Sequence, residues 1–440
     1  MSVKDMVTEL VEKMIQQNAL PPYLYIASKK SFDPDEDWVF YSGPTWDGEE
    51  LIAGVEAFLT GKWLVSGEGV AKFEKAFSRK YELASSVMVN SGSSANLVMV
   101  AALKKHFGWE DSDEVIVSPV GFPTTIAPLV QNNLKPVFVD ITFDDLNFDL
   151  DLVEKAITAR TKAIFISPVL GNPPDMDRLQ KIAEKKKVLL VLDGCDSLGS
   201  RWQGKDLSHY AYVTSCSFYP AHHITTGEGG MVSSNDKKLV HLARSFAWWG
   251  RDCFCVGTAN LTGTGACKHR FGKWLEGYEG KIDHKYYFTN QGYNLKPLDM
   301  QGAIGLKQLE KVDQIHKNRR INKKRIEKIF KKHLGELVEV PQEHKKSETS
   351  WFGVPIICKE RRMKEKLVAY LEANRIQTRN YFAGNILLHP AYKELGEASN
   401  FPYANKVLEQ VFFVGCHSGY LEEVFAYIDR VLAAFVLENC

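Results

Sequence analysis

Four short segments of the chain combine residue types that can bind a small phosphorylated ligand and transfer a proton on it. They are residues 90–95, 121–125, 188–193 and 215–230. The first, Asn-Ser-Gly-Ser-Ser-Ala, has small residues that let backbone N–H groups and hydroxyls approach a phosphate, although an ordinary helix cap has the same residues. The second contains Phe122, which can either stack on a flat ligand or fill the core.

The third and fourth segments supply an acid and a base. Asp193 ends the apolar run 188–192, and a carboxylate in such a place is expected to need a cationic partner, for example a protonated pyridine nitrogen. The fourth segment places His222 and His223 shortly after Ser217. Imidazole, with a reference pKa of about 6.5, can move a proton at neutral pH. The four segments in this order are more specific than any one of them.

The elements that position these segments form an alternating pattern from about residue 70 to residue 240. The predicted strands are 87–89, 114–118, 136–139, 163–169, 188–192 and 213–217, and helical patterns such as 94–107 and 176–187 lie between them. Strand–helix alternation implies crossover connections, and hence an α/β fold with a mainly parallel sheet and helices on both faces. The four segments follow strands, and open sheets of this kind bind ligands at that edge.

The rest of the chain predicts three parts. Residues 1–40 form a helical extension with a proline-containing arm, residues 41–299 a large ligand-binding domain, and residues 300–440 a long helix followed by a smaller α/β domain. The long helix is expected from residue 300 to about residue 333. Its basic run 319–325 is typical of a solvent-exposed helix face.

Composition excludes several classes of protein. The formal net charge of +1 argues against a nucleic-acid surface. Charges throughout the N-terminal residues argue against a signal peptide, and prolines interrupt the uncharged stretch 115–134, which we expect to be strand, loop and helix rather than a membrane span. The eight cysteines are expected to be thiols or metal ligands in a reducing cytoplasm.

Over nearly its whole length the sequence resembles the fold-type I, pyridoxal-phosphate-dependent sugar aminotransferase (DegT/DnrJ/EryC1) superfamily. Further matching positions are 63–67 (Trp-Leu-Val-Ser-Gly) and 292–296 (Gly-Tyr-Asn-Leu-Lys). The resemblance implies that Phe122 stacks on the cofactor ring, that Asp193 pairs with the ring nitrogen, and that Asn294 reaches the phosphate of a neighbouring subunit in a homodimer. It implies that the phosphate is bound by Gly92, Ser93, Ser94 and Ser217. Lys296 departs from the superfamily, which more often has arginine there.

His222 stands where the aminotransferases have the cofactor-binding lysine. Imidazole cannot form a Schiff base with pyridoxal phosphate, and no lysine lies between Lys205 and Lys237. With pyridoxamine phosphate, however, the histidine can remove a proton, which predicts dehydration instead of transamination. The segment 218–230 is similar to that of the CDP-4-keto-6-deoxyglucose 3-dehydrase family, which also implies roles for Tyr219 and Asp196 beside the cofactor.

The 3-dehydrases of that family bind a [2Fe–2S] cluster through four cysteines. The resemblance implies that the ligands here are Cys195, Cys253, Cys255 and Cys267. The spacing between the last two is longer than the family's, which a loop insertion at 257–265 would explain because closure entropy rises slowly with loop length. Zinc accepts the same donors, and free thiols are the third alternative.

We therefore expect a 3-dehydrase of a nucleotide-linked 4-keto-6-deoxyhexose. His222 would act as the base, a separate iron–sulfur flavin reductase would recharge the cluster, and the product would enter 3,6-dideoxyhexose synthesis for lipopolysaccharide O-antigen. One alternative is a cluster-independent GDP-4-keto-6-deoxymannose 3-dehydratase that uses pyridoxamine phosphate and glutamate. The other is a catalytically silent binding subunit. The sequence determines neither the nucleotide nor the sugar stereoisomer.

Overall fold

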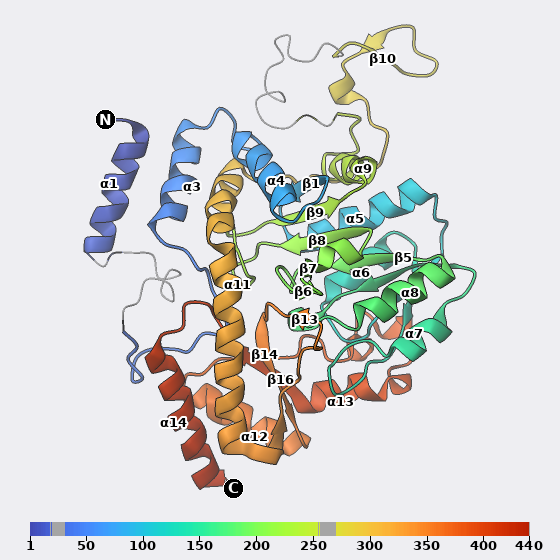
Figure 1. The fold of residues 1–440 in the computed structure, drawn as a ribbon. Coiled ribbons are helices and arrows are strands. Elements are labelled where there is room, and N and C mark those ends of the chain that lie inside the picture. Colours follow the sequence, from blue (N-terminus) through green and yellow to red (C-terminus); the bar gives the residue numbers. More distant parts are fainter. Residues whose placement is uncertain (18, 20–30, 254, 256–269, 440) are drawn as a thin grey trace.

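The computed structural model describes residues 1–17, 19, 31–253, 255 and 270–439 (Figure 1). Helix α11 (Asp299–Leu334) runs the length of the molecule, past α3 and α4 to a smaller sheet. The other helices are α1 (Val3–Gln16), α3 (Gly48–Thr60), α4 (Glu68–Lys80), α5 (Gly92–Phe107), α6 (Pro123–Gln131), α7 (Leu150–Ala156), α8 (Met176–Lys186), α9 (Lys237–Ala247), α12 (Arg361–Ala373), α13 (Pro402–Gln410) and α14 (Glu422–Asn439).

The larger sheet has seven strands in the order β1-β9-β8-β5-β4-β2-β3. They are β1 (Ser85–Val89), β2 (Glu114–Val117), β3 (Lys135–Phe138), β4 (Thr161–Ile166), β5 (Leu189–Asp193), β8 (Val213–Ser217) and β9 (Gly230–Ser234). From β3 to β8 neighbouring strands are parallel, whereas β9 is antiparallel to both β1 and β8. The predicted α/β class is confirmed. The sequence analysis did not predict β9, because its run of Gly, Met, Val and two serines has no clear strand pattern.

Helices cover both faces of this sheet. In β5, Val191 packs into a cluster with residues of α5, while Leu190 and Leu192 pack into another with residues of α8. Successive side chains of a strand point to opposite faces, so a strand covered on both sides is apolar throughout. Each such buried side chain stabilises the fold by about 1.5–3 kcal/mol relative to exposure.

The smaller sheet has four antiparallel strands in the order β12-β14-β16-β15. They are β12 (Val338–Glu339), β14 (Gly353–Cys358), β15 (Thr378–Asn380) and β16 (Val411–Gly415). The remaining strands are β6 (Arg201–Trp202), β7 (Lys205–Asp206), β10 (Lys273–Trp274), β11 (Lys281–Ile282) and β13 (Ser347–Glu348). Pairing of β13 with β6 joins the segment after α11 to the loop that follows β5.

The prediction that residues 319–325 form a solvent-exposed helix face is wrong for Arg319, Asn322 and Lys323, which are buried. Arg319 is fully buried, and its Nη1 donates hydrogen bonds to the carbonyl oxygens of Trp351 (3.2 Å) and Phe352 (3.0 Å). A guanidinium can remain buried where its donors reach such acceptors. Because α11 packs between other elements, charge pattern alone did not identify its buried stripe. Arg319 thus places a positive charge inside the molecule.

The uncharged stretch 115–134 begins in β2, continues as a loop and then forms α6 and the start of the connection to β3. The prediction of strand, loop and helix is confirmed. None of the helices in the described ranges combines the length and the apolar character that crossing a membrane requires.

Candidate functional site

The residues singled out in the sequence meet at the carboxyl ends of the parallel strands. A cavity of about 280 Å³ lies there, beside the starts of α5 and α6. Its lining includes Gly92, Ser93, Phe122, Asp193, Cys195, Asp196, Ser217, Tyr219 and His222. We call it the reaction cavity. Crossover connections return each parallel strand to the same edge of the sheet, which is why segments far apart in sequence converge.

The start of α5 forms one end of the reaction cavity. The Ser91 hydroxyl accepts a hydrogen bond from the Ser94 N–H at 3.0 Å and caps the helix, so the helix-cap interpretation is correct for this pair. A Cβ on Gly92 would lie 2.4 Å from Cβ of Ser217 and 3.0 Å from Sγ of Cys195, so only glycine fits there. The Ser93 hydroxyl donates a hydrogen bond to the hydroxyl of Thr124, another residue of the lining, at 3.1 Å. The positive end of the helix dipole and these hydroxyls fit a phosphate.

Asp193 lies at the end of β5 and is almost completely buried. Its Oδ2 accepts hydrogen bonds from Asn96 Nδ2 (2.8 Å) and Thr125 Oγ1 (2.6 Å), two residues that the sequence analysis missed. Within the described ranges Asp193 forms no ion pair with a lysine or arginine. Neutral donors therefore hold this carboxylate in place and leave its charge uncompensated, which fits a cationic ring nitrogen as its ligand.

His222 is buried beside a second carboxylate. Its Nδ1 has no hydrogen-bond partner among the described residues and lies 3.6 Å from Oδ1 of Asp196. Burial and the charge of Arg319 lower the pKa of His222 to about 3, and a hydrogen bond from the imidazole to the backbone of Cys195 opposes this shift only in part. Burial and the charge of Asp193 raise the pKa of Asp196 to about 7. At neutral pH the imidazole is therefore uncharged and its contact with Asp196 is not an ion pair, which is the state a proton acceptor requires.

Aromatic side chains form the walls of the cavity. Phe122 and Tyr219 are each about half exposed (50% and 48%) and line it. Further walls are supplied by Phe382, and by Tyr41 and Phe352, which the sequence analysis did not identify as lining residues. The ring of His222 lies 5.2 Å from that of Phe352, so the residue just before β14 of the smaller sheet helps to orient it. No local motif signals such residues, because they come from elements far away in sequence.

Asn294 is absent from the lining of the reaction cavity in its own chain. Its Oδ1 accepts a hydrogen bond from Lys296, whose Nζ lies 3.2 Å from the ring centroid of Trp249. Burial lowers the pKa of Lys296 to about 8. The predicted contact between Asn294 and a neighbouring subunit's phosphate stays a prediction.

The cysteines predicted to bind a cluster are only partly described. Cys195 lines the reaction cavity, and burial next to Asp193 raises the pKa of its thiol well above the usual value. Cys253 is buried and Cys255 is half-buried, whereas Cys267 lies outside the described residues. Across the described ranges no three His, Cys, Asp or Glu side chains are arranged to bind a metal ion. A four-thiolate site is thus not formed by this part of the chain, and the cluster stays a prediction.

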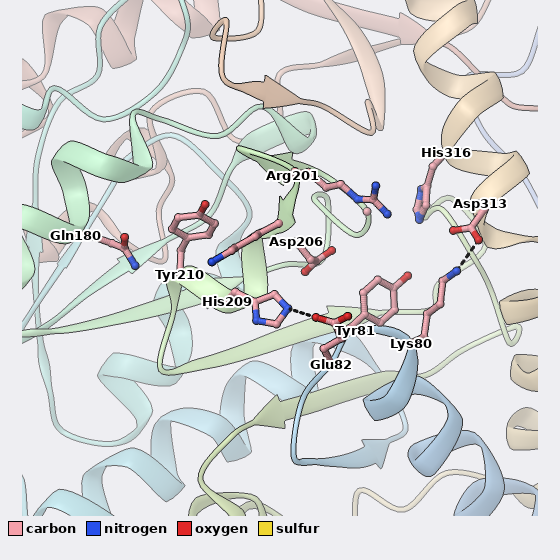
Figure 2. A pocket seen from close by; sticks show the side chains of 13 residues that line it. Lys80, Tyr81, Glu82, Gln180, Arg201, Asp206, His209, Tyr210, Asp313 and His316 are labelled. Atoms are coloured by element: carbon pink, nitrogen blue, oxygen red, sulfur yellow. Dashed lines mark hydrogen bonds and ion pairs between the residues drawn. The ribbon is translucent and has the colours of Figure 1, made fainter.

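A second cavity, of about 530 Å³, lies away from all of these residues (Figure 2). Some of its charged side chains are paired with each other. Lys80 contacts Asp313 at 2.6 Å, and His209 approaches Glu82 at 3.8 Å. None of the residues predicted to act in chemistry lines it. We call it the polar cavity.

The fold and the cavity at its strand ends define the class of fold-type I pyridoxal-phosphate-dependent aminotransferases. The chain belongs to the DegT/DnrJ/EryC1/StrS aminotransferase family, which it matches over residues 46–435, so the superfamily predicted from the sequence is confirmed.

Three relatives are informative. The lipopolysaccharide biosynthesis protein RfbH of Salmonella typhimurium is 36% identical over 99% of this chain and 97% of that protein. The dTDP-4-dehydro-2,6-dideoxy-D-glucose 3-dehydratase of Saccharopolyspora spinosa is 37% identical over 90% of this chain and 86% of that one. The structure of E. coli GDP-4-keto-6-deoxy-D-mannose-3-dehydratase with bound hydrated PLP has a TM-score of 0.78 and 31% identity, and it covers 90% of this chain and 99% of that chain.

Proposed function

We propose that this protein is a 3-dehydratase of a nucleotide-linked 4-keto-6-deoxyhexose that works with pyridoxamine phosphate. The observation that carries the proposal is His222, a buried and uncharged imidazole that lines a cavity of an aminotransferase fold and whose Nδ1 has no hydrogen-bond partner in the described part of the chain. Two relatives named as 3-dehydratases act on sugars linked to different nucleotides, dTDP and GDP, so the nucleotide stays open. We place the reaction in 3,6-dideoxyhexose synthesis in the cytoplasm.

The cavity fits the cofactor at both ends. Gly92 lets the start of α5 approach Ser217 closely, which brings both to the end proposed to bind the phosphate, and Asp193, held by Asn96 and Thr125, offers its charge to a ring nitrogen. Phe122 provides an aromatic face between these ends. When bound, pyridoxamine phosphate would supply an amine that reacts with the 4-keto group and a ring that accepts electrons.

His222 and Asp196 are the residues that move the proton. In this proposal the imidazole of His222 would take up the proton lost from the carbon next to the reacting amine, and Asp196, whose Oδ1 lies 3.6 Å from Nδ1, would stabilise the positive charge that the imidazole gains. Asp196, with a pKa raised to about 7, can then exchange its own proton near neutral pH. Tyr219 and Phe352, which flank the imidazole, restrict the access of water.

The test separates binding from proton transfer. Protein loaded with pyridoxamine phosphate in deuterium oxide is expected to exchange the C4′ proton, as measured by NMR. His222→Asn is expected to bind the cofactor with unchanged fluorescence titration but to lose exchange and dehydration by about 10²–10⁴-fold. His209→Asn, in the polar cavity, is the matched control and should exchange normally. Undiminished exchange in His222→Asn would overturn the proposal.

For the electron supply we propose a [2Fe–2S] cluster bound by Cys195, Cys253, Cys255 and Cys267 and recharged by a separate iron–sulfur flavin reductase. Its support is the cysteine spacing and the position of Cys195 in the wall of the reaction cavity. Anaerobically purified protein should contain iron and sulfide and give a reduced-state EPR signal that Cys253→Ser abolishes and Cys358→Ala leaves intact. Iron-free protein that turns over with glutamate would instead establish the cluster-independent alternative.

We also propose a homodimer in which Asn294 of each subunit binds the other's cofactor phosphate. Large apolar side chains are strongly exposed in residues 271–288, the segment that precedes Asn294 in the sequence, as expected of an interface. They include Phe271 (60%), Tyr278 (56%), Tyr286 (67%) and Phe288 (52%). Mixing inactive Asn294→Ala with inactive His222→Asn subunits should restore one intact site per mixed dimer. A monomer by light scattering, or no recovery in verified mixed dimers, would reject shared sites.

A further inference from the structure

Residues 38–46 form an N-terminal arm. Its residue Tyr41 lines the reaction cavity and precedes the part of the chain that matches the family, which begins at residue 46. Backbone bonds tie Val39 to Arg375 (2.8 Å) and Gln377 (3.0 Å) just before β15. The N–H of Tyr41 donates to Oε1 of Gln377 at 3.2 Å.

The other side of the arm contacts the loop that contains His222. The Ser42 hydroxyl donates to the carbonyl of Ala221 at 2.5 Å, and Trp46 Nε1 donates to the carbonyl of Thr225 at 3.1 Å. The arm therefore connects the smaller sheet to the catalytic loop, and the bonds on both sides of Tyr41 hold it in place.

Tyr41 stands where two cavities meet. Beyond the reaction cavity lies an outer cavity of about 740 Å³, and both are lined by Tyr41, Phe122, Phe352 and Phe382. The ring of Tyr41 packs against Phe413 (5.9 Å) and Phe352 (6.5 Å). The outer cavity has further flat or apolar walls, including Pro390 and Tyr392. Aromatic walls of this kind stack on nucleobases.

A positive charge lies at the same junction. The guanidinium of Arg379, on β15, is 4.3 Å from the centroid of the Tyr41 ring and lines the outer cavity. Its Nη1 donates to the carbonyl of Thr378 at 2.7 Å, and no carboxylate pairs with it within the described part of the chain. By contrast Arg325, which also covers an aromatic ring (Phe425, 3.6 Å), is paired with Glu422. An uncompensated guanidinium in a cavity is suited to a phosphate oxygen.

We propose that Tyr41 separates a sugar chamber from a nucleoside chamber and that Tyr41 and Arg379 together hold the diphosphate that joins the two. The inference rests on the proposed function for the identity of the substrate as a nucleotide-linked sugar. The sugar occupies the reaction cavity next to His222, the diphosphate lies at the junction, and the nucleoside occupies the outer cavity. Arg379 binds phosphate oxygens, and the Tyr41 hydroxyl donates a hydrogen bond to one of them. Tyr41 is thus a specificity residue supplied by the arm.

The test uses nucleoside diphosphates alone, so it needs no turnover. Calorimetry with CDP, GDP, dTDP and UDP on the full-length protein loaded with pyridoxamine phosphate identifies the diphosphate that binds most tightly. Arg379→Gln should weaken its binding by roughly 10- to 100-fold, and Tyr41→Phe by roughly 3- to 10-fold, since charged and neutral hydrogen bonds differ in this way. Arg325→Gln should bind within twofold of the unmodified protein. Cofactor titration and thermal unfolding of Tyr41→Phe should be unchanged.

Three results would overturn the inference. They are no binding of any of the four diphosphates at millimolar concentration, unchanged binding in Arg379→Gln, or unchanged binding in Tyr41→Phe. Failure of the proposed function looks different. In that case the protein binds a diphosphate through both side chains and yet dehydrates no 4-keto sugar. That result would support the two chambers and reject the proposed dehydratase activity.

Discussion

The reaction cavity and the polar cavity of Figure 2 contain the same kinds of buried titratable groups. Burial lowers the pKa of His222 in the first and of His316 in the second to about 3. Burial likewise raises the pKa of Asp196 in the first, to about 7, and of Asp206 in the second. Shifted pKa values alone therefore do not distinguish the two.

The difference lies in what these groups contact. Nδ1 of His316 is hydrogen-bonded to the Ser350 hydroxyl at 2.7 Å, and Asp206 accepts two bonds from Ser208. One ring nitrogen of each histidine has no hydrogen-bond partner among the described residues, Nδ1 of His222 and Nε2 of His316. Nδ1 of His222, however, lies 3.6 Å from Oδ1 of Asp196, in the cavity at the strand ends. Desolvation shifts pKa values wherever a group is buried. A reactive site additionally needs groups left free for a ligand, and in this fold they gather at the strand ends.

The largest difference in the rate of dehydration is expected between two variants that each lose one carboxylate, Asp193→Asn in the reaction cavity and Asp206→Asn in the polar cavity. Asp193→Asn takes the charge away from the proposed ring nitrogen and should reduce dehydration by about 10²–10³-fold, as for breaking a buried ion pair. Asp206→Asn should leave turnover within twofold. Steady-state kinetics with saturating pyridoxamine phosphate measures both. Equal losses in the two variants would contradict the assignment of the reaction cavity.

Each cavity contains a glycine whose replacement by alanine has a different physical effect, a steric clash at Gly92 and backbone strain at Gly204. Gly92→Ala puts a Cβ 2.4 Å from Cβ of Ser217 and should weaken pyridoxamine phosphate binding roughly 10- to 100-fold, because the phosphate end is displaced. Gly204→Ala meets no atom within 4 Å, but its φ of +77° is unfavourable for alanine, so it should cost about 1–2 kcal/mol of stability without affecting the cofactor. Fluorescence titration and urea unfolding distinguish the two outcomes.

The pH dependence of turnover tests the pairing of His222 with Asp196. The pKa of Asp196 is raised to about 7, so the carboxyl is protonated below this pH and cannot stabilise a protonated imidazole. We expect the rate to fall as the pH drops below about 7. Asp196→Asn should remove this dependence and lower the plateau roughly tenfold. Persistence of the same acidic limb in Asp196→Asn would assign it to another group.

The smallest effect is predicted for the histidine of the polar cavity. His316→Phe loses the bond to Ser350 and should lower the free energy of unfolding by about 1–2 kcal/mol, since a buried hydroxyl loses its partner. Turnover should stay within twofold of the unmodified protein. A large loss of turnover in a stably folded His316→Phe would show that the two cavities are coupled.

Much of the framework was predictable from the sequence because it depends on local patterns. The apolar run before Asp193 predicted β5, and small residues before a helical pattern predicted the phosphate end of α5. The sequence analysis missed β9, with its serines, and did not recognise the buried side of α11 around Arg319. The predicted division at residue 299 stays a prediction.

The partners of the site residues were not predictable. Asn96 and Thr125 bond to Asp193 from two different helices, and Tyr41 reaches the cavity from an arm with no motif. Each has a residue type common in proteins, so its role follows only from its position. For the cysteines the limit is different, because Cys267 lies outside the described residues.

The sequence by itself determined what the side chain at position 222 can do, because an imidazole cannot form a Schiff base with pyridoxal phosphate whatever the fold does. Only the tertiary structure decided that this imidazole is uncharged and that Asp196 is half protonated at neutral pH. The tertiary structure also brought Tyr41 of the N-terminal arm to the wall shared by the reaction cavity and the outer cavity. Protonation states depend on burial and on charges such as Arg319, and those are brought into place only by folding.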